Sequence, residues 1–305
     1  MLSELPLVVF TIVAQMSVGS FVVLGLIHLF GGRAGRHVID RASDPALYAI
    51  GPILVLGLLA SMMHLGTPIR AINALRHLDS SWLSREILFG LLFAAVGGAF
   101  AFCQWFKWLT PRWRQGLASL AALIGLALIA VMSMVYMLPT VPAWNSWATP
   151  ARFFATTFLL GSLAVGAALV AAAEVRRRRG TVGDEATQRV IISSLRGVAI
   201  GAIAMLGVEF VVVPLYVGKL AIGGSAAAAA SEGALVNTYG WFAVVQLVLI
   251  FLGVALLGVF LSRLARPFNT ARMLALAPVA AFVLVFGGEI IGRMLFYASY
   301  ARVGL

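Results

Sequence analysis

Long apolar stretches, separated by short polar ones, run through the whole 305-residue chain. Eight of them approach or exceed the roughly 20 residues that a helix needs to cross a hydrocarbon core about 30 Å thick. They cover residues 5–30, 46–65, 87–106, 116–138, 153–173, 198–217, 241–261 and 274–297. A transmembrane barrel would show short alternating segments instead. The pattern predicts an all-α fold, with residues 1–305 forming one bundle of eight transmembrane helices.

Composition supports a membrane protein and excludes a soluble one. The chain is 62% hydrophobic and 11% charged, with a mean hydropathy of +1.01, whereas about a quarter of the residues in a soluble domain are charged. The first apolar stretch is too long for a cleavable signal, and Glu4 stands where a signal would have basic residues. Cys103 is the only cysteine, which rules out an internal disulfide and a cysteine-ligated cluster.

Basic residues predict the orientation. Eight spans put both termini on one side, and the loops on the opposite side carry these fourteen: Arg33, Arg36, Arg41, Lys107, Arg112, Arg114, Arg176, Arg177, Arg178, Arg179, Arg189, Arg263, Arg266 and Arg272. The side of the termini has seven: Arg70, Arg76, Arg85, Arg152, Lys219, Arg293 and Arg302. The positive-inside rule therefore places both termini outside. The net charge of +11 reflects this orientation and contact with anionic lipid, not nucleic-acid binding.

Two ionisable residues lie at the outer ends of neighbouring spans. His64 ends the second span and Glu86 begins the third, with a short loop between them. Imidazole can hydrogen-bond a phenolic oxygen, and a partly buried carboxylate can take a proton and release it to water. This suits oxidation of a hydroquinone, which loses two protons with two electrons. The alternative is that both are interfacial polar caps, and spacing alone slightly favours it.

Other polar residues within the spans have simpler interpretations. Glu289 and Arg293 are four residues apart on one helix face and predict a structural ion pair. Glu209 has no partner in its own helix, so it either pairs with a donor from another helix or lines a polar cavity. Gln15 is typical of a helix–helix contact.

Two external loops and the histidines are also informative. Three prolines exclude a helix from residues 138–150, which form either an interfacial anchor or a lid and docking ledge. The segment 223–233 suits a short alanine helix between glycine hinges. The four histidines are His28, His37, His64 and His77. No two of them are expected at similar depth on facing helices, so no haem is expected.

Five segments in order resemble the membrane anchor subunit of bacterial dimethyl sulfoxide reductases. They are "PLVVFTIVAQMSVGSFVVLGL", "ASMMHLGTPIRAINAL", "LSREILFGLLFAAVGG", "TVPAWNSWATPARFF" and "GGEIIGRMLFY". The resemblance implies a multi-pass protein of the bacterial inner membrane with periplasmic termini. It implies that the anchor holds an iron–sulfur subunit and a molybdopterin catalytic subunit, and that it oxidises menaquinol at His64 and Glu86. The resemblance therefore favours a functional role for His64 and Glu86 over the interpretation as polar caps.

The resemblance leads to specific site hypotheses. We expect menaquinol as a bound substrate, with electrons passing directly to the partner's cluster because this chain offers no redox centre. The candidate quinol pocket also includes Gln15, Thr67, Arg70 and Trp144, and the candidate docking surface includes Arg70, Arg76 and Trp147. Alternatives are a polysulfide-reductase-type anchor, or a secondary transporter that uses Glu209, Glu289 and Arg293.

Overall fold

The computed structural model of the protein describes residues 4–30, 35, 37–49, 52, 75–180, 185–264 and 271–303. Every regular element in these ranges is helical. In chain order they are α1 (Leu5–Phe30), a helix over residues 37–49, the 3₁₀ turn η4 (Leu75–His77), α4 (Trp82–Trp105), α5 (Pro111–Tyr136), α6 (Ala148–Arg178), α7 (Glu185–Ala221), α8 (Ala226–Gly233), the π-helix η5 (Ala234–Thr238), α9 (Gly240–Leu264) and α10 (Ala271–Ala298).

Seven of the described helices are long and apolar enough to cross a membrane, namely α1, α4, α5, α6, α7, α9 and α10. The all-α prediction is therefore confirmed for the described residues, and α1 has the predicted bounds. The predicted span 46–65 lies largely outside the described residues. The count of eight therefore stays a prediction.

The connections between helices differ from the expectation in one place and agree with it in another. The prediction that prolines exclude a helix from residues 138–150 is wrong at its end, because α6 begins at Ala148 and includes Pro150. Proline is tolerated in a first turn, where the amide hydrogens have no partner within the helix. The alanine helix is confirmed as α8, whose first turn is capped by a 3.1 Å bond from the Ala228 amide to Ser225 Oγ.

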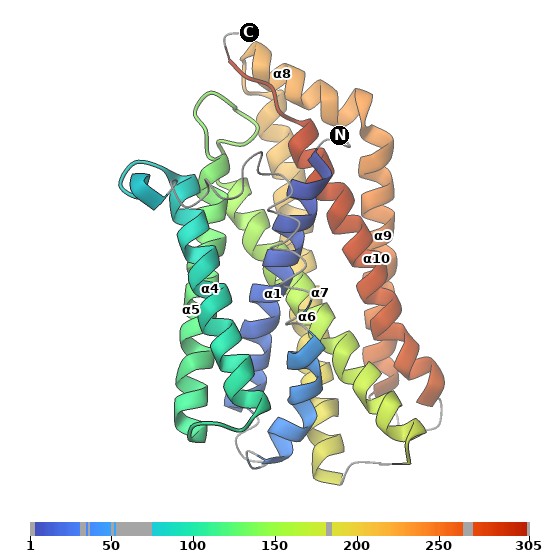
Figure 1. The fold of residues 1–305 in the computed structure, drawn as a ribbon. Coiled ribbons are helices and arrows are strands. Elements are labelled where there is room, and N and C mark those ends of the chain that lie inside the picture. The colour runs from blue at the N-terminus through green and yellow to red at the C-terminus, as the bar shows by residue number, and fades with distance from the viewer. Residues whose placement is uncertain are drawn as a thin grey trace.

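The helices pack as a bundle around α1 and α6 (Figure 1). Neighbouring pairs are α1 with α6, α4 with α5, α6 with α7, and α9 with α10. The most apolar window of α1 is 78% buried, whereas that of α4 is only 22% buried. An apolar helix that the protein itself covers lies at the centre of the bundle, so α1 is a core element and α4 faces lipid.

A pair of glycines allows α1 and α6 to approach closely. A Cβ atom added to Gly161 would overlap the carbonyl carbon of Gly19, and one added to Gly19 would overlap the carbonyl oxygen of Thr157. No side chain fits between the two backbones at this crossing. Small residues at a helix crossing are the usual means of close packing in membranes.

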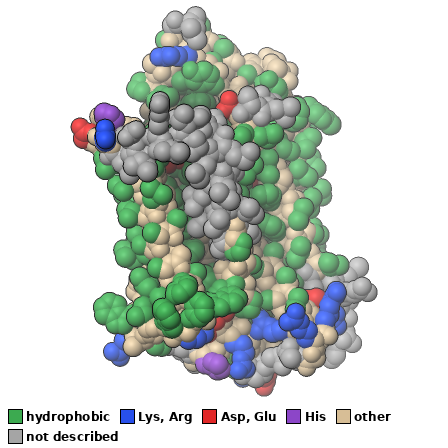
Figure 2. Space-filling model, viewed as in Figure 1, with side chains coloured by type: hydrophobic (Ala, Val, Ile, Leu, Met, Phe, Trp, Pro, Cys, Tyr) green, Lys and Arg blue, Asp and Glu red, His purple; other side chains and the backbone are tan. Residues whose placement is uncertain are grey.

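The two ends of the bundle differ in charge. Both termini lie at one end, called the terminal end here (Figure 1), and Lys and Arg side chains gather at the other, called the basic end (Figure 2). Exposed tryptophans mark both ends: Trp82, Trp147 and Trp241 at the first, and Trp105, Trp108 and Trp113 at the second. The predicted orientation is based on the excess of Lys and Arg at the basic end. The orientation itself stays a prediction.

Candidate functional site

Glu86 faces the bundle interior from the first turns of α4. Ser81 caps this helix by accepting a 3.3 Å hydrogen bond from the Ser84 amide. The neighbouring Arg85 turns outward, where its Nε donates to Leu78 O at 2.7 Å and its Nη2 donates to Asp79 O at 2.7 Å. Glu86 points the opposite way and is 7% exposed. The capped turn thus sends the cation to the surface and the carboxylate inward.

Two tyrosine hydroxyls lie near Glu86. Tyr136, at the end of α5, and Tyr297, near the end of α10, are joined by a 2.7 Å hydrogen bond between their hydroxyl oxygens. Both are buried, and both are close enough to Glu86 to interact with it electrostatically. Glu86 therefore lies within electrostatic range of two phenolic hydroxyls that were not among the predicted site residues. His64, Thr67 and Arg70 lie outside the described residues, so their placement beside Glu86 stays a prediction.

Trp144 belongs to the interior of the bundle, unlike the other tryptophans. Its Nε1 donates to Phe296 O at 2.8 Å, and its ring stacks on Phe296 with centroids 5.3 Å apart. Tyr136 contacts the same two rings edge-on. The Val303 amide donates to Thr140 O at 2.8 Å, which ties the same loop to the C-terminal segment. The loop is therefore fixed to the bundle, and Trp147 remains exposed at its surface.

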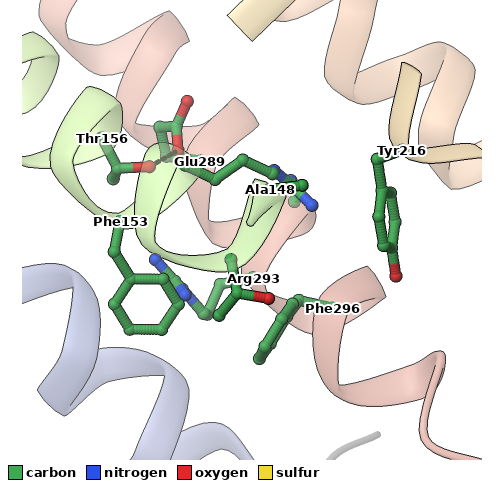
Figure 3. Close-up of a pocket in the computed structure, with 10 residues that line it drawn as sticks. Ala148, Phe153, Thr156, Tyr216, Glu289, Arg293 and Phe296 are labelled. Carbon is green, nitrogen blue, oxygen red and sulfur yellow. Dashed lines mark hydrogen bonds between the residues drawn. The ribbon is translucent and has the colours of Figure 1, made fainter. Parts of the chain in front are cut away.

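A second polar cluster joins α1, α6, α7 and α10, and Figure 3 shows its part around Thr156, Glu289 and Arg293. Thr156 Oγ1 lies 2.9 Å from Glu289 Oε2 and 3.4 Å from Glu209 Oε1. Arg293 Nη2 donates to Gln15 Oε1 at 2.8 Å, and Gln15 Nε2 donates to Phe153 O at 3.3 Å. Both polar groups of Gln15 are therefore occupied by contacts between helices. Glu209 finds a hydroxyl from another helix, which was one of its two expected roles.

Glu289 and Arg293 interact electrostatically, but each side chain has a close partner on another helix. The Arg293 guanidinium turns toward the Phe153 ring, with its Cζ 3.9 Å from the ring centroid, while the Glu289 carboxylate turns toward Thr156 (Figure 3). Spacing four residues apart places both on one helix face, but partners on α1 and α6 then determine where each side chain points. A guanidinium can stack on an aromatic ring and still donate hydrogen bonds, because its N–H groups lie in the plane of the guanidinium itself.

A small polar cavity lies beside this second cluster. It is partly open, has about 10 Å³ of space for the centre of a water-sized molecule, and is lined by Ala148, Thr149, Arg152, Phe153, Thr156, Tyr216, Glu289, Gly292, Arg293 and Phe296. Three buried polar atoms of its lining lack a hydrogen-bond partner: Glu289 Oε1, Arg293 Nε and the Tyr216 hydroxyl. Such groups usually bond to protein or to ordered water. The cavity thus has room for a water molecule, and its lining includes polar atoms to which a water could bond.

A third polar group, at the basic end, has a structural arrangement. Lys107 Nζ lies 2.7 Å from Asp44 Oδ2 and 3.6 Å from Asp40 Oδ2. Gln104 donates to Asp44 Oδ1 and accepts from Arg114 Nη1, both at 2.7 Å. These bonds attach the helix over residues 37–49 to α4 and α5. Among the described residues, no three His, Cys, Asp or Glu side chains gather as metal ligands.

Sequence reasoning selected Glu86 as a candidate site residue but did not select Thr156 or the Tyr136–Tyr297 pair. A charge in an apolar span is conspicuous because it is costly there. Hydroxyls are common in membrane helices and give no comparable signal. The available hint was that a phenol or hydroxyl buried in an apolar helix needs a partner.

The fold and these polar groups define a polytopic helical membrane protein. Residues 1–299 match the DMSO reductase anchor subunit (DmsC) family, and the chain belongs to that family. The expected resemblance is therefore confirmed, together with a multi-pass location in the bacterial inner membrane.

Individual relatives agree with this assignment. The chain is 31% identical over 310 residues to the YnfH chain of an anaerobic dimethyl sulfoxide reductase from Escherichia coli K12, with 99% of this chain and 96% of the relative covered. It is 32% identical over 306 residues to another anaerobic dimethyl sulfoxide reductase chain from the same strain, with the same coverage. A shorter match, 37% identical over 82 residues and covering 25% of each protein, is to a sulfite dehydrogenase subunit of Allochromatium vinosum.

Proposed function

We propose that this chain is the menaquinol-oxidising anchor of a dimethyl sulfoxide reductase-like complex. Family membership supports an anchor in an oxidoreductase complex. The observation that carries the site is Glu86, a carboxylate 7% exposed in the first turns of a membrane helix and within electrostatic range of a pair of buried phenolic hydroxyls. Because an ionisable group within a membrane span is costly, it is usually retained for a function.

The proposed roles follow from the chemistry of each group. His64 orients one hydroxyl of the quinol by a hydrogen bond, and Glu86 accepts a proton from it. The aromatic side chains of Trp144 and Phe296, fixed to each other by stacking, are proposed to form an apolar wall of the quinol pocket. The two electrons leave to an iron–sulfur partner, since the chain's single cysteine provides no cluster ligand set of its own.

Separate substitutions of His64→Ala and Glu86→Gln test this function. Each is expected to reduce menaquinol-dependent turnover of the purified complex by at least about 100-fold, in the range of losses for an acid–base group. Turnover with an artificial soluble electron donor should stay at the wild-type level, because that donor bypasses the quinol site. Arg85→Gln is a matched control, since Arg85 points away from the interior and bonds to the carbonyls of Leu78 and Asp79, in the turn that follows η4.

Loss of both activities in the same variant would show that assembly had failed. Full quinol activity in either variant would contradict the proposed site. The artificial-donor measurement therefore separates a defect in chemistry from a defect in folding.

The iron–sulfur partner is proposed to dock on the terminal end, near Arg70, Arg76 and Trp147. Arg76 and Trp147 are both exposed there, and Trp147 extends from a loop fixed to the bundle. A photo-crosslinking residue at position 76 or 147 should capture the iron–sulfur partner, whereas one at Trp113 on the basic end should not. Crosslinks found only from position 113 would contradict both the docking site and the orientation.

A further inference from the structure

The second cluster has an uneven balance of buried charge. Glu209 and Glu289 are each 4% exposed and Arg293 is 6% exposed, while Arg152 is partly exposed. With every group ionised, the fully buried set would hold two negative charges and one positive charge. An uncompensated charge in a low-dielectric interior is strongly unfavourable. One proton on either carboxyl group would balance the buried set.

Hydrogen-bond geometry indicates which carboxyl group carries that proton. Thr156 Oγ1 contacts both carboxyl groups, yet a hydroxyl has a single hydrogen to donate. The shorter contact, 2.9 Å to Glu289 Oε2, fits donation by Thr156. The 3.4 Å contact to Glu209 Oε1 is then a hydrogen bond only if Glu209 supplies the hydrogen and Thr156 accepts it. Without a hydrogen on Glu209, a lone pair of Thr156 Oγ1 would face the Glu209 Oε1 atom with no hydrogen between them.

The cavity provides a route by which this proton exchanges. Glu289 Oε2 is bonded to Thr156, and its other oxygen, Oε1, is buried without a partner next to the cavity. Arg293 Nε and the Tyr216 hydroxyl are also unpartnered there. A water in the cavity bonded to Glu289 Oε1 would connect this carboxyl group to Thr149 and Arg152 in the first turns of α6, at the terminal end.

We propose that Glu209, Thr156 and Glu289 form a buried proton-binding relay, with the proton resting on Glu209 and leaving through the cavity beside Glu289. In the transfer, the Glu209 O–H bond breaks as Thr156 Oγ1 takes that hydrogen. The original Thr156 hydrogen moves to Glu289 Oε2 in the same step. The protonated Glu289 carboxyl group then rotates about its Cγ–Cδ bond, which brings its O–H to the cavity side, and it releases the proton to the cavity water and becomes a carboxylate again.

The surrounding groups favour one neutral and one ionised carboxyl. The charged or titratable neighbours are Arg152 from α6, Tyr216 from α7, Arg293 and Tyr297 from α10, and Tyr136 from α5. From α1 and α9 come the neutral amides of Gln15 and Gln246. The buried Arg293 balances an ionised Glu289. The second cation, Arg152, also interacts with both carboxyl groups, but it is partly exposed, so solvent screens its charge and it balances Glu209 less completely than a buried cation would.

Infrared spectroscopy of the purified complex in its resting state tests the relay directly. The wild type should show a protonated-carboxyl C=O band that shifts in D₂O, and Glu209→Gln should remove it. Thr156→Val keeps the side-chain shape but removes the hydroxyl, so the band should move to higher frequency. Thr156→Ser should keep it in place. Glu174→Gln is the control, because Glu174 is bonded to Arg177 and Arg178 at the surface and carries no such proton.

An unchanged carboxyl region in Glu209→Gln would overturn the proposal. Loss of the band in Glu289→Gln with its retention in Glu209→Gln would overturn the assignment of the resting proton. A role for the relay in turnover rests on the proposed function, since the protons would come from the quinol. In that case Thr156→Val should slow menaquinol turnover several-fold and Thr156→Ser should not. Equal rates in the two variants would overturn that role, while absence of quinol turnover in the wild type would overturn only the proposed function.

Discussion

Single residues in this protein satisfy several partners at once, and Arg293 shows how. Its guanidinium donates to the Gln15 amide at 2.8 Å and covers the Phe153 ring at 3.9 Å. Lysine could not do both, because an ammonium group lacks the flat face and the fork of donors. A buried cation is tolerated here because an amide and an aromatic ring replace its hydration.

A double-mutant cycle measures how strongly Gln15 and Arg293 depend on each other. Gln15→Leu removes the acceptor of a buried charged donor, so the free energy of unfolding should fall by about 1.5–3 kcal/mol. Replacing both residues, with Gln15→Leu and Arg293→Met, should lose less than the sum of the two single changes, by about 0.5–3 kcal/mol. Reversible unfolding in detergent and denaturant gives these values.

The control for this cycle is Gln188→Leu, which lies exposed on α7 and should change stability little. Strict additivity of the two core substitutions would mean that the amide and the guanidinium do not stabilise each other.

At the scale of elements, α6 contacts α7 and α10 near its start and α1 further along. Near its start, Thr149, Arg152 and Thr156 face the polar cavity against α7 and α10. Further along, Gly161 allows contact with the backbone of α1. The glycine crossing determines the depth and rotation of α1 against α6. It therefore also determines whether Gln15 reaches Arg293.

Gly161→Ala tests the importance of that crossing. The added methyl group would overlap the α1 backbone, so the helices must separate, and the free energy of unfolding should fall by about 1–3 kcal/mol. Gly98→Ala on α4 is the matched change, because a Cβ there meets no atom within 4 Å. It should be neutral or stabilise by up to about 1 kcal/mol. Equal effects of the two changes would show that the close contact is not required.

At the scale of the whole molecule, polar chemistry is concentrated toward the terminal end. Glu86, the Tyr136–Tyr297 pair and the cavity all lie there, whereas the basic end holds the Lys107–Asp44 clamp. The described inner parts of α4 offer Cys103 and Gln104, and Gln104 is already bonded to Asp44 and Arg114. No described series of polar side chains connects that end to Glu86.

This arrangement predicts that quinol oxidation by this subunit is electroneutral. Protons and electrons from the proposed site would both leave at the terminal end, so no net charge would cross the membrane. The complex, reconstituted in liposomes with menaquinol and a potential-sensitive dye, should turn over without building a membrane potential. A turnover-dependent potential that collapses with an uncoupler would contradict this mechanism.

The sequence by itself determined the class of the protein, the position of most spans and the family. Hydropathy is a local property of about 20 residues, because each span must satisfy its own backbone hydrogen bonds in lipid. The bounds of α1, the alanine helix α8 and the conspicuous charge at Glu86 were therefore visible in the chain alone. The prediction for Pro150 was wrong because a proline breaks a helix everywhere except in its first turn, and the sequence did not show where α6 begins.

Only the tertiary structure decided the partners of the buried polar groups. Tyr136 and Tyr297 are 161 residues apart in sequence, Thr156 and Glu289 are 133 apart, and Gln15 and Arg293 are 278 apart. Glu289 and Arg293, which sequence spacing would pair, turn to other helices instead. Such contacts depend on the rotation and depth of each helix. Packing between helices, as at Gly19 and Gly161, determines these quantities, and a periodic pattern within one helix contains no information about them.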